Sequence, residues 1–348
     1  MRKMMRMAGW AGAMLSTMGC PASAADFDLT YTTEMQLSLT SGEANWVNLL
    51  RLDFSQELSH GFRFGLATVS IAKTRGERLM DDLQTFSNIE EDNLPLALSV
   101  MGMEWHKGQS DWFFGIRNLN EDYFTSPVTS LFTNSSCGIF PTLSANFPLA
   151  NYPVASVGLH YRLTAEHWGV QASLYNGTGY SGFAGRENVF RVCPASDGLL
   201  GITSVNYRKN DNGYYLGCAL HSGVRGSDEN GVEENVAAEA AKMRTVLWAY
   251  AEQQVGSGLS VLAQGSLVPG ASSGCRSYAG LGLVMKCGAT EGGLFADYAD
   301  FSGMHEWAGE LTWKIPCRES LTVQPALHFV SNSTGCDAVV LLRLSYTF

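Results

Sequence analysis

Charged residues are scarce in this sequence of 348 residues. Asp, Glu, Lys and Arg make up 16% of the chain, whereas soluble domains carry about a quarter. Basic residues are fewer than acidic ones, with 23 Lys and Arg against 33 Asp and Glu. A protein that binds phosphate backbones needs a positive surface, so nucleic acid is not an expected partner.

Long apolar runs are also missing from most of the chain. No stretch after Ala25 has 18 consecutive apolar residues, so the sequence predicts no transmembrane helix there. Aromatic residues nevertheless make up 11% of the chain. Apart from helices, only closed β-barrels satisfy their backbone hydrogen bonds in lipid. Few charges, many aromatic residues and no helix-length apolar span therefore favour a barrel in a membrane.

The first 25 residues have the order of a secretory signal peptide. Arg2, Lys3 and Arg6 precede an apolar segment that runs from Met7 to Met18, and small residues follow up to Ala25. We therefore expect residues 1–25 to be cleaved and residues 26–348 to form the mature domain. Lipid attachment at Cys20 is the alternative, but the apolar residue usual three places earlier is missing.

The two ends of the mature chain alternate between apolar and polar residues with a period of two. Near the start, Met35, Leu37 and Leu39 alternate with polar residues, and the last segment alternates in the same way until it stops at Phe348. In a membrane barrel this alternation turns apolar side chains to lipid and polar ones to the lumen. A final strand that ends in an aromatic residue resembles the assembly signal of bacterial outer-membrane barrels.

About sixteen segments of strand character follow one another, and the connections between them differ by parity. Every second connection has 4 to 7 residues, and these are Ser55–Gly61, His106–Asp111, Thr164–His167, Arg208–Gly213, Gln254–Gly258, Cys287–Gly292 and Ile315–Glu319. The interleaved set includes the long connections Lys73–Leu96, Leu119–Tyr152, Gly177–Asp197 and Gly223–Lys242. We expect an all-β, antiparallel transmembrane barrel with short periplasmic turns and long extracellular loops, because a soluble sandwich or propeller would not separate connection lengths in this way. Glu77–Phe86 and Val236–Met243 are expected to form short helices in outer loops.

Two regions of the sequence resemble a known family. Trp112-Phe-Phe-Gly-Ile-Arg-Asn-Leu-Asn-Glu-Asp-Tyr-Phe leads into Pro141, Pro148 and Pro153, and Val323-Gln-Pro-Ala-Leu-His-Phe precedes the end of the chain. These segments resemble the carbohydrate-selective porin family of the OprB type, although Cys137 stands where an aromatic residue is expected. The resemblance implies a barrel of sixteen strands in the bacterial outer membrane. It also implies a third loop that folds inward to narrow the pore, and passive diffusion of glucose-like sugars.

The residues that would contact a diffusing sugar are those that face the lumen. Arginine donates two hydrogen bonds from a planar fork, and carboxylates accept from sugar hydroxyls. The candidates on strands are Glu34, Arg51, Asp53, Arg117, His160, Arg162 and Arg343, and those in the inward loop are Glu121, Asp122, Tyr123 and Phe124. Tyr123 and Phe124 are candidates for stacking on sugar rings. The alternative is that the charges hydrate the lumen or pair across strands.

Tryptophans near the predicted strand ends, Trp248 among them, are expected in the aromatic girdles at the membrane surfaces. The cysteines are expected at the rims, where an oxidising compartment permits disulfides. Cys137, Cys193, Cys275 and Cys336 could form two bridges between outer loops, and Cys287 and Cys317 a third at the short-turn rim. The alternative is that they remain free thiols.

Other functions remain open at this point. A general porin for small polar solutes is one alternative, and a structural or adhesive barrel with a plugged lumen is another. An enzyme is not expected, because neither a G-x-S-x-G nor an H-E-x-x-H motif occurs. The expected partners are sugars and outer-membrane lipid, with no cofactor and no metal, and the assembly could be a monomer or a homotrimer.

Overall fold

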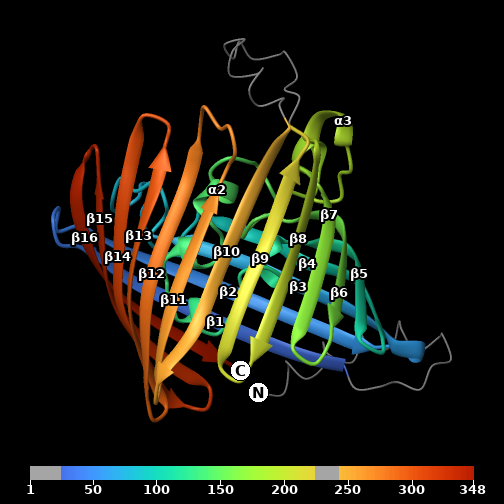
Figure 1. Cartoon of the computed structure of the whole chain (residues 1–348), viewed down its shortest axis with the longest axis horizontal. Coiled ribbons are helices and arrows are strands. Elements are labelled where there is room, and N and C mark those ends of the chain that lie inside the picture. The colour runs from blue at the N-terminus through green and yellow to red at the C-terminus, as the bar shows by residue number, and fades with distance from the viewer. Residues whose placement is uncertain (1–24, 224–242) are drawn as a thin grey trace, which may run out of the picture.

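The chain folds as a closed antiparallel β-barrel (Figure 1). The computed structural model describes residues 25–223 and 243–348, and within these ranges it has sixteen strands. They are β1 (Ala25–Ser38), β2 (Ala44–Glu57), β3 (Phe62–Lys73), β4 (Leu94–Lys107), β5 (Ser110–Arg117), β6 (Ser156–Thr164), β7 (Trp168–Asn176), β8 (Leu199–Lys209), β9 (Asn212–His221), β10 (Arg244–Gly256), β11 (Leu259–Leu267), β12 (Cys275–Cys287), β13 (Thr290–Phe301), β14 (Met304–Arg318), β15 (Leu321–Asn332) and β16 (Gly335–Thr347). The predicted signal peptide, with Cys20, lies outside the described residues apart from Ala25, and so does the helix predicted at Val236–Met243 apart from Met243.

Each strand pairs with its neighbours in the chain, and the first strand closes the barrel on the last. Tyr31 of β1 lies opposite Tyr346 of β16 on one side and opposite Leu50 of β2 on the other. Closure leaves no open sheet edge, which is the condition for strands to span a lipid bilayer. The predicted connections Thr164–His167 and Gly177–Asp197 leave residues 168–176 for a strand, which are the bounds of β7, and the other strand ends differ from the predicted connections by a few residues at most sites.

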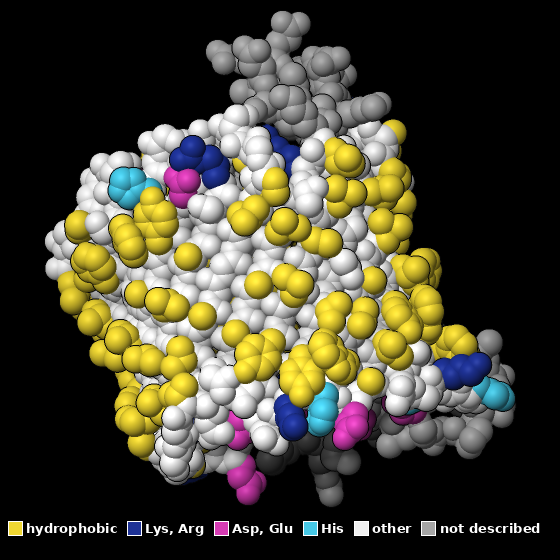
Figure 2. Space-filling model, in the orientation of Figure 1, with side chains coloured by type: hydrophobic (Ala, Val, Ile, Leu, Met, Phe, Trp, Pro, Cys, Tyr) yellow, Lys and Arg dark blue, Asp and Glu magenta, His cyan; other side chains and the backbone are white. Residues whose placement is uncertain are grey.

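Apolar side chains cover the outside of the barrel. In β1, Met35 and Leu37 are 63% and 43% exposed, whereas the alternating Glu34 is fully buried on the lumen side. Figure 2 shows hydrophobic side chains spread over the strands, with charged side chains gathered toward the two rims. No helix within the described ranges has the length and apolar character needed to cross a membrane. The period-two alternation is confirmed, and its exposed apolar face is the surface that lipid covers.

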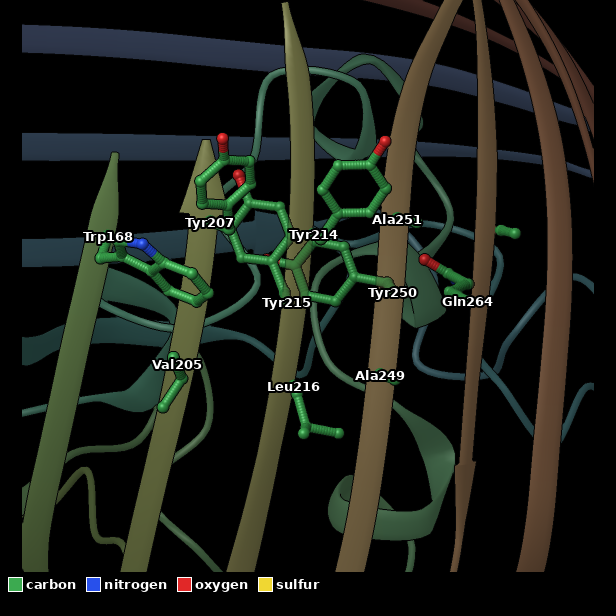
Figure 3. Close-up of a pocket in the computed structure, with 11 residues that line it drawn as sticks. Trp168, Val205, Tyr207, Tyr214, Tyr215, Leu216, Ala249, Tyr250, Ala251 and Gln264 are labelled. Carbon is green, nitrogen blue, oxygen red and sulfur yellow. The ribbon is translucent and has the colours of Figure 1, made fainter. Parts of the chain in front are cut away.

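The two rims differ as predicted. The seven connections at the rim that holds both chain ends have at most four residues each, whereas the opposite rim carries the long loops (Figure 1). Aromatic side chains lie outward near both rims, for example Trp46 at the loop rim and a group of Trp168, Tyr207 and Tyr214 at the turn rim (Figure 3). The expectation for Trp248 is wrong. Its ring turns into the lumen and is 3% exposed, because it packs against a loop inside the barrel.

The third outer loop (118–155) folds into the lumen, as the resemblance implied. It contains the short helix α2 (Pro141–Ser144), and its apolar side chains pack against inward residues of β8–β13. Phe132 meets Phe295 with ring centroids 5.1 Å apart, and Phe140 stacks on Tyr278 at 5.3 Å. This half of the wall therefore carries large apolar side chains on its inner face, where a water-filled lumen would require polar residues. The loop occupies that space in place of water.

The second outer loop (74–93) also folds inward, which the sequence did not predict. Leu79, Met80 and Phe86 pack against Val330 and Leu341 in a cluster on the inner face of β14–β16. The helix expected at Glu77–Phe86 is absent from this described segment. Its backbone N–H groups bond to carboxylates instead of to carbonyls one turn earlier. Together the two loops cover the wall from β8 to β16 and leave a passage beside β1–β5.

The lipid-facing surface gives a first prediction. Leu281 lies in the middle of β12 and is 66% exposed on the outer face. We expect Leu281→Arg to lower the free energy of unfolding by about 2–4 kcal/mol, as charges do near the bilayer midplane. The measurement is equilibrium unfolding by guanidinium in lipid vesicles. Thr40→Lys, at an exposed turn position of the loop rim, is the control and should be neutral. Equal stability of both variants would contradict a lipid-facing position for Leu281.

Candidate functional site

The passage is divided by an ion pair that joins the wall to the third outer loop. Arg51 of β2 and Glu121 of the loop line both the outer cavity, of about 660 Å³, and a smaller cavity of about 220 Å³ toward the turn rim. Arg51 Nη1 donates to Glu121 Oε1 at 2.8 Å, and its Nε and Nη2 donate to Asp53 at 2.8 and 2.7 Å. Asp53 lies two residues along β2 and therefore on the same inward face. The pair spans the place where the two cavities meet.

The loop backbone holds Glu121 in this position. Leu119, Asn120 and Glu121 form a single 3-10 turn directly after β5. The Leu119 N–H donates to the Ala150 carbonyl at 2.8 Å, and Ser99 Oγ of β4 donates to Glu121 Oε1 at 3.0 Å. Both ends of the turn are thus tied down. The carboxylate is therefore fixed toward Arg51 while its side chain remains 18% exposed to the passage.

A second group of alternating charges lies next to the first. Arg117 of β5 donates from Nη1 to Glu104 Oε1 at 3.0 Å and from Nη2 to Asp122 Oδ1 at 2.8 Å. Arg162 of β6 donates to the same Asp122 oxygen at 2.9 Å, and Arg63 of β3 pairs with Glu104. The order of charges along the wall is therefore Arg63, Glu104, Arg117, Asp122, Arg162. Neighbouring opposite charges partly cancel, so no single sign dominates this part of the passage.

The structure brings six of the residues predicted to contact the solute together at this constriction, namely Arg51, Asp53, Arg117, Glu121, Asp122 and Arg162. Arg343 lies apart from them, on the wall of the outer cavity. Its Nε donates to Glu34 Oε1 at 2.7 Å and its Nη2 to Asn88 Oδ1 at 2.6 Å. Glu34 is fully buried and also accepts from Ser87 Oγ at 2.7 Å. It therefore secures the second outer loop rather than the passage.

The other three predicted residues lie behind the passage surface. His160 is 3% exposed and its Nδ1 is 2.7 Å from Ser173 Oγ. The Tyr123 hydroxyl, 1% exposed, donates to the Ile202 carbonyl at 3.1 Å, and burial raises the pKa of Tyr123, so the phenol stays neutral. Phe124 packs against Trp248 with centroids 4.8 Å apart. Burial of Tyr123 and Phe124 leaves little ring surface for the stacking role that the sequence suggested.

Sequence reasoning missed the carboxylates that anchor the loops to the wall. Glu310 of β14 accepts hydrogen bonds from the Thr133 N–H at 2.8 Å, the Asn134 N–H at 2.9 Å and Thr133 Oγ1 at 2.9 Å. Glu252 of β10 accepts from the Val128 N–H at 2.8 Å and from Ser126 Oγ at 2.5 Å. Each carboxylate thereby satisfies two or three donors of the third outer loop.

Two further acids extend this anchoring to the second outer loop. Glu306 of β14 accepts from the Leu83 N–H at 2.7 Å and the Gln84 N–H at 3.0 Å. Asp297 of β13 accepts from Gln84 Nε2 at 3.1 Å and from Asn134 Nδ2 at 3.3 Å, so it joins both loops. The alternation of the strands could have identified Asp297, Glu306 and Glu310, because they stand at inward positions between outward residues such as Leu294, Trp307 and Leu311.

The seven described cysteines are free thiols in this structure. Cys137 lies in the third outer loop, as expected, but its 3-10 turn is packed inside the lumen. Burial raises the pKa of the Cys137 thiol, which keeps it protonated. The proposed bridges are therefore not formed here. Within the described ranges, no group of three or more His, Cys, Asp or Glu side chains could hold a metal ion.

Comparison with known proteins agrees with this architecture. The family model described as "Carbohydrate-selective porin, OprB family" matches residues 28–302. The high-pH structure of Pseudomonas putida OprB is similar to the chain with a TM-score of 0.77 and 18% identity, covering 97% of each chain. An engineered variant of the Rhodopseudomonas blastica porin is similar with a TM-score of 0.61 and 11% identity, covering 93% of this chain and 100% of the other. No curated protein matches the sequence.

The anchoring carboxylates give a second prediction. We expect Glu310→Ala to lower the free energy of unfolding by about 1–3 kcal/mol, because buried N–H groups of Thr133 and Asn134 lose their acceptor. The measurement is urea unfolding in lipid vesicles, with proteolysis of the third outer loop as a second readout. Glu319→Ala, in an exposed short turn, is the control. A Glu310 variant as stable and as protease-resistant as the control would refute the anchoring role.

Asp82 of the second outer loop gives a pH prediction. Burial raises the pKa of Asp82 to about 7, with Arg78, Glu90 and Glu306 as its charged neighbours, whereas a free Asp titrates near pH ~3.9. The folded loop therefore retains a proton that the undocked loop has lost. Its docking is most stable below pH ~4 and weakens as pH rises through about 7.

The measurement is hydrogen exchange of residues 79–90 between pH 5.5 and 8.5 on purified protein, corrected for the intrinsic rate. Protection should fall several-fold toward the alkaline end. Asp82→Asn should flatten this dependence, since the amide does not ionise. An unchanged pH profile in the variant would exclude Asp82 as its origin.

Proposed function

The chain belongs to the OprB family of carbohydrate-selective porins, and we propose that its constriction admits sugars by exchanging internal ion-pair contacts for contacts with sugar hydroxyls. It is a channel of the bacterial outer membrane through which sugars diffuse passively. The observation that supports our proposal is the Arg51–Glu121 pair. It spans the passage, and its side chains are 31% and 18% exposed.

Arg51 and Glu121 offer a sugar complementary groups at one place. The guanidinium presents several N–H donors in a plane, and the carboxylate accepts from neighbouring hydroxyls. The same groups already bond to each other, so a sugar exchanges one set of hydrogen bonds for another of similar strength. Binding is then weak enough for release, as diffusion requires. Asp53, Arg117 and Arg162 extend this surface toward the turn rim, and the buried Asp122 holds the two arginines in place.

The same geometry distinguishes a sugar channel from most of the alternative functions. A channel needs no nucleophile or proton transfer, and the family is one of channels rather than enzymes. Cavities on both sides of the Arg51–Glu121 pair favour a conducting pore over a plugged structural barrel. A general porin for small polar solutes is the remaining alternative. A comparison of the influx rates of different solutes distinguishes it from a sugar-selective channel. Glucose-like sugars as the preferred solutes, export by residues 1–25 and assembly as a homotrimer are further parts of the proposal.

Liposome swelling tests the role of the constriction. We expect Arg51→Ala to speed disaccharide influx several-fold while glucose influx changes little, because loss of the guanidinium widens the passage and removes a sugar contact. Arg276→Ala is the matched control, since Arg276 forms an exposed pair with Asp300 near the loop rim. Influx that follows solute size alone in the wild type, for sugars and an amino acid alike, would identify a general porin.

A further inference from the structure

A third cavity lies on the turn side of the third outer loop. It has a volume of about 560 Å³ and is enclosed between loop residues 122–126 and the inner face of β6–β10. Its volume falls in the range of ~300–1,000 Å³ that small-molecule sites occupy. Polar side chains of β6–β8 form one part of the wall, and the aromatic side chains of β9 and β10 form the other. A solute that has crossed the constriction can therefore meet a mixed polar and aromatic surface.

Tyr215 supplies the accessible aromatic ring of this cavity. It is half-buried on the inner face of β9 and stacks on Tyr250 of β10, with centroids 4.1 Å apart and planes 10° from parallel (Figure 3). Its ring lies over Gly213, where an added Cβ would come within 2.8 Å of Tyr215 Cε2. Tyr250 is only 5% exposed. Tyr250 covers one face of the Tyr215 ring. The exposed part of the ring borders the cavity.

Two planar donors stand beside this ring. Asn206 of β8 lies directly opposite Tyr215 in the strand register, and Arg208 follows two residues later on the same inward face. Within the described part of the chain, neither side chain makes a hydrogen bond or an ion pair with another side chain. Arg162 and Gln171, which line the same cavity, are engaged with Asp122. Asn206 and Arg208 are thus two planar donors of this cavity that can bond to a ligand.

We propose that Tyr215, Asn206 and Arg208 form a sugar-binding station on the turn side of the constriction. The apolar C–H face of a pyranose packs on the Tyr215 ring, while the amide and guanidinium donate to hydroxyls at its edge. The station rests on the proposed function, since sugar must first cross the Arg51–Glu121 constriction. It assigns the stacking contact to a strand residue, in place of the buried Tyr123 and Phe124 of the loop.

Ion current through the purified full-length protein in a planar bilayer tests the station, with maltose added on the side of the short turns. We expect maltose to lower the wild-type current saturably. Tyr215→Leu should raise the half-maximal maltose concentration about 2- to 10-fold, the value of an aromatic contact. Tyr215→Phe should stay within about twofold of wild type, because it keeps the ring. The matched control is Tyr214→Leu, which alters the adjacent, lipid-facing tyrosine and should have no effect.

The outcomes separate the station from the channel function. Equal half-maximal concentrations for Tyr215→Leu and Tyr214→Leu would overturn the station. So would a wild-type current that maltose leaves unchanged, provided that glucose still swells vesicles that contain the protein. Absence of swelling with any sugar would instead overturn the proposed function, and the station with it.

Discussion

A loop that folds into a barrel lumen brings backbone N–H groups that no strand can pair, and each one left buried without an acceptor costs about 1–3 kcal/mol. In this protein, carboxylates on the inner wall accept them. Glu252 and Glu310 serve the third outer loop, Glu306 serves the second, and Asp297 joins the two. These four acids help to give the passage a defined shape, because they fix the loops that border it.

The same arrangement divides the lumen into two halves with different chemistry. From β8 to β16 the inner wall is covered by loops, so apolar side chains such as Leu262 and Phe295 are buried there as in a soluble core. Beside β1–β5 the wall stays open to solute and carries the alternating charges around Arg51 and Arg117. The charged constriction therefore lies on one side of the barrel, and the carboxylates that anchor the loops lie on the other.

Sequence pattern was sufficient for the barrel because strand alternation and turn length are local. The strand count, the difference between the rims and the inward third loop were all predictable, the last from the resemblance. The inward second loop was not, since its docking depends on Glu306, which is more than 200 residues away in the chain. Burial of Tyr123 and His160 was missed for a similar reason. Alternation shows which face a side chain takes, but not whether a loop then covers that face.

The closure of the barrel has a consequence for the order of assembly. Strand β1 pairs with β16, and the second outer loop rests on β14–β16. Neither contact can form until the last residues have been delivered to the membrane. Contacts between such distant segments form slowly, because a long stretch of chain must be ordered before they give any stabilisation. The β1–β16 seam and the docked second outer loop are therefore formed last, and a chain that lacks its final strands has neither a sealed wall nor a finished pore.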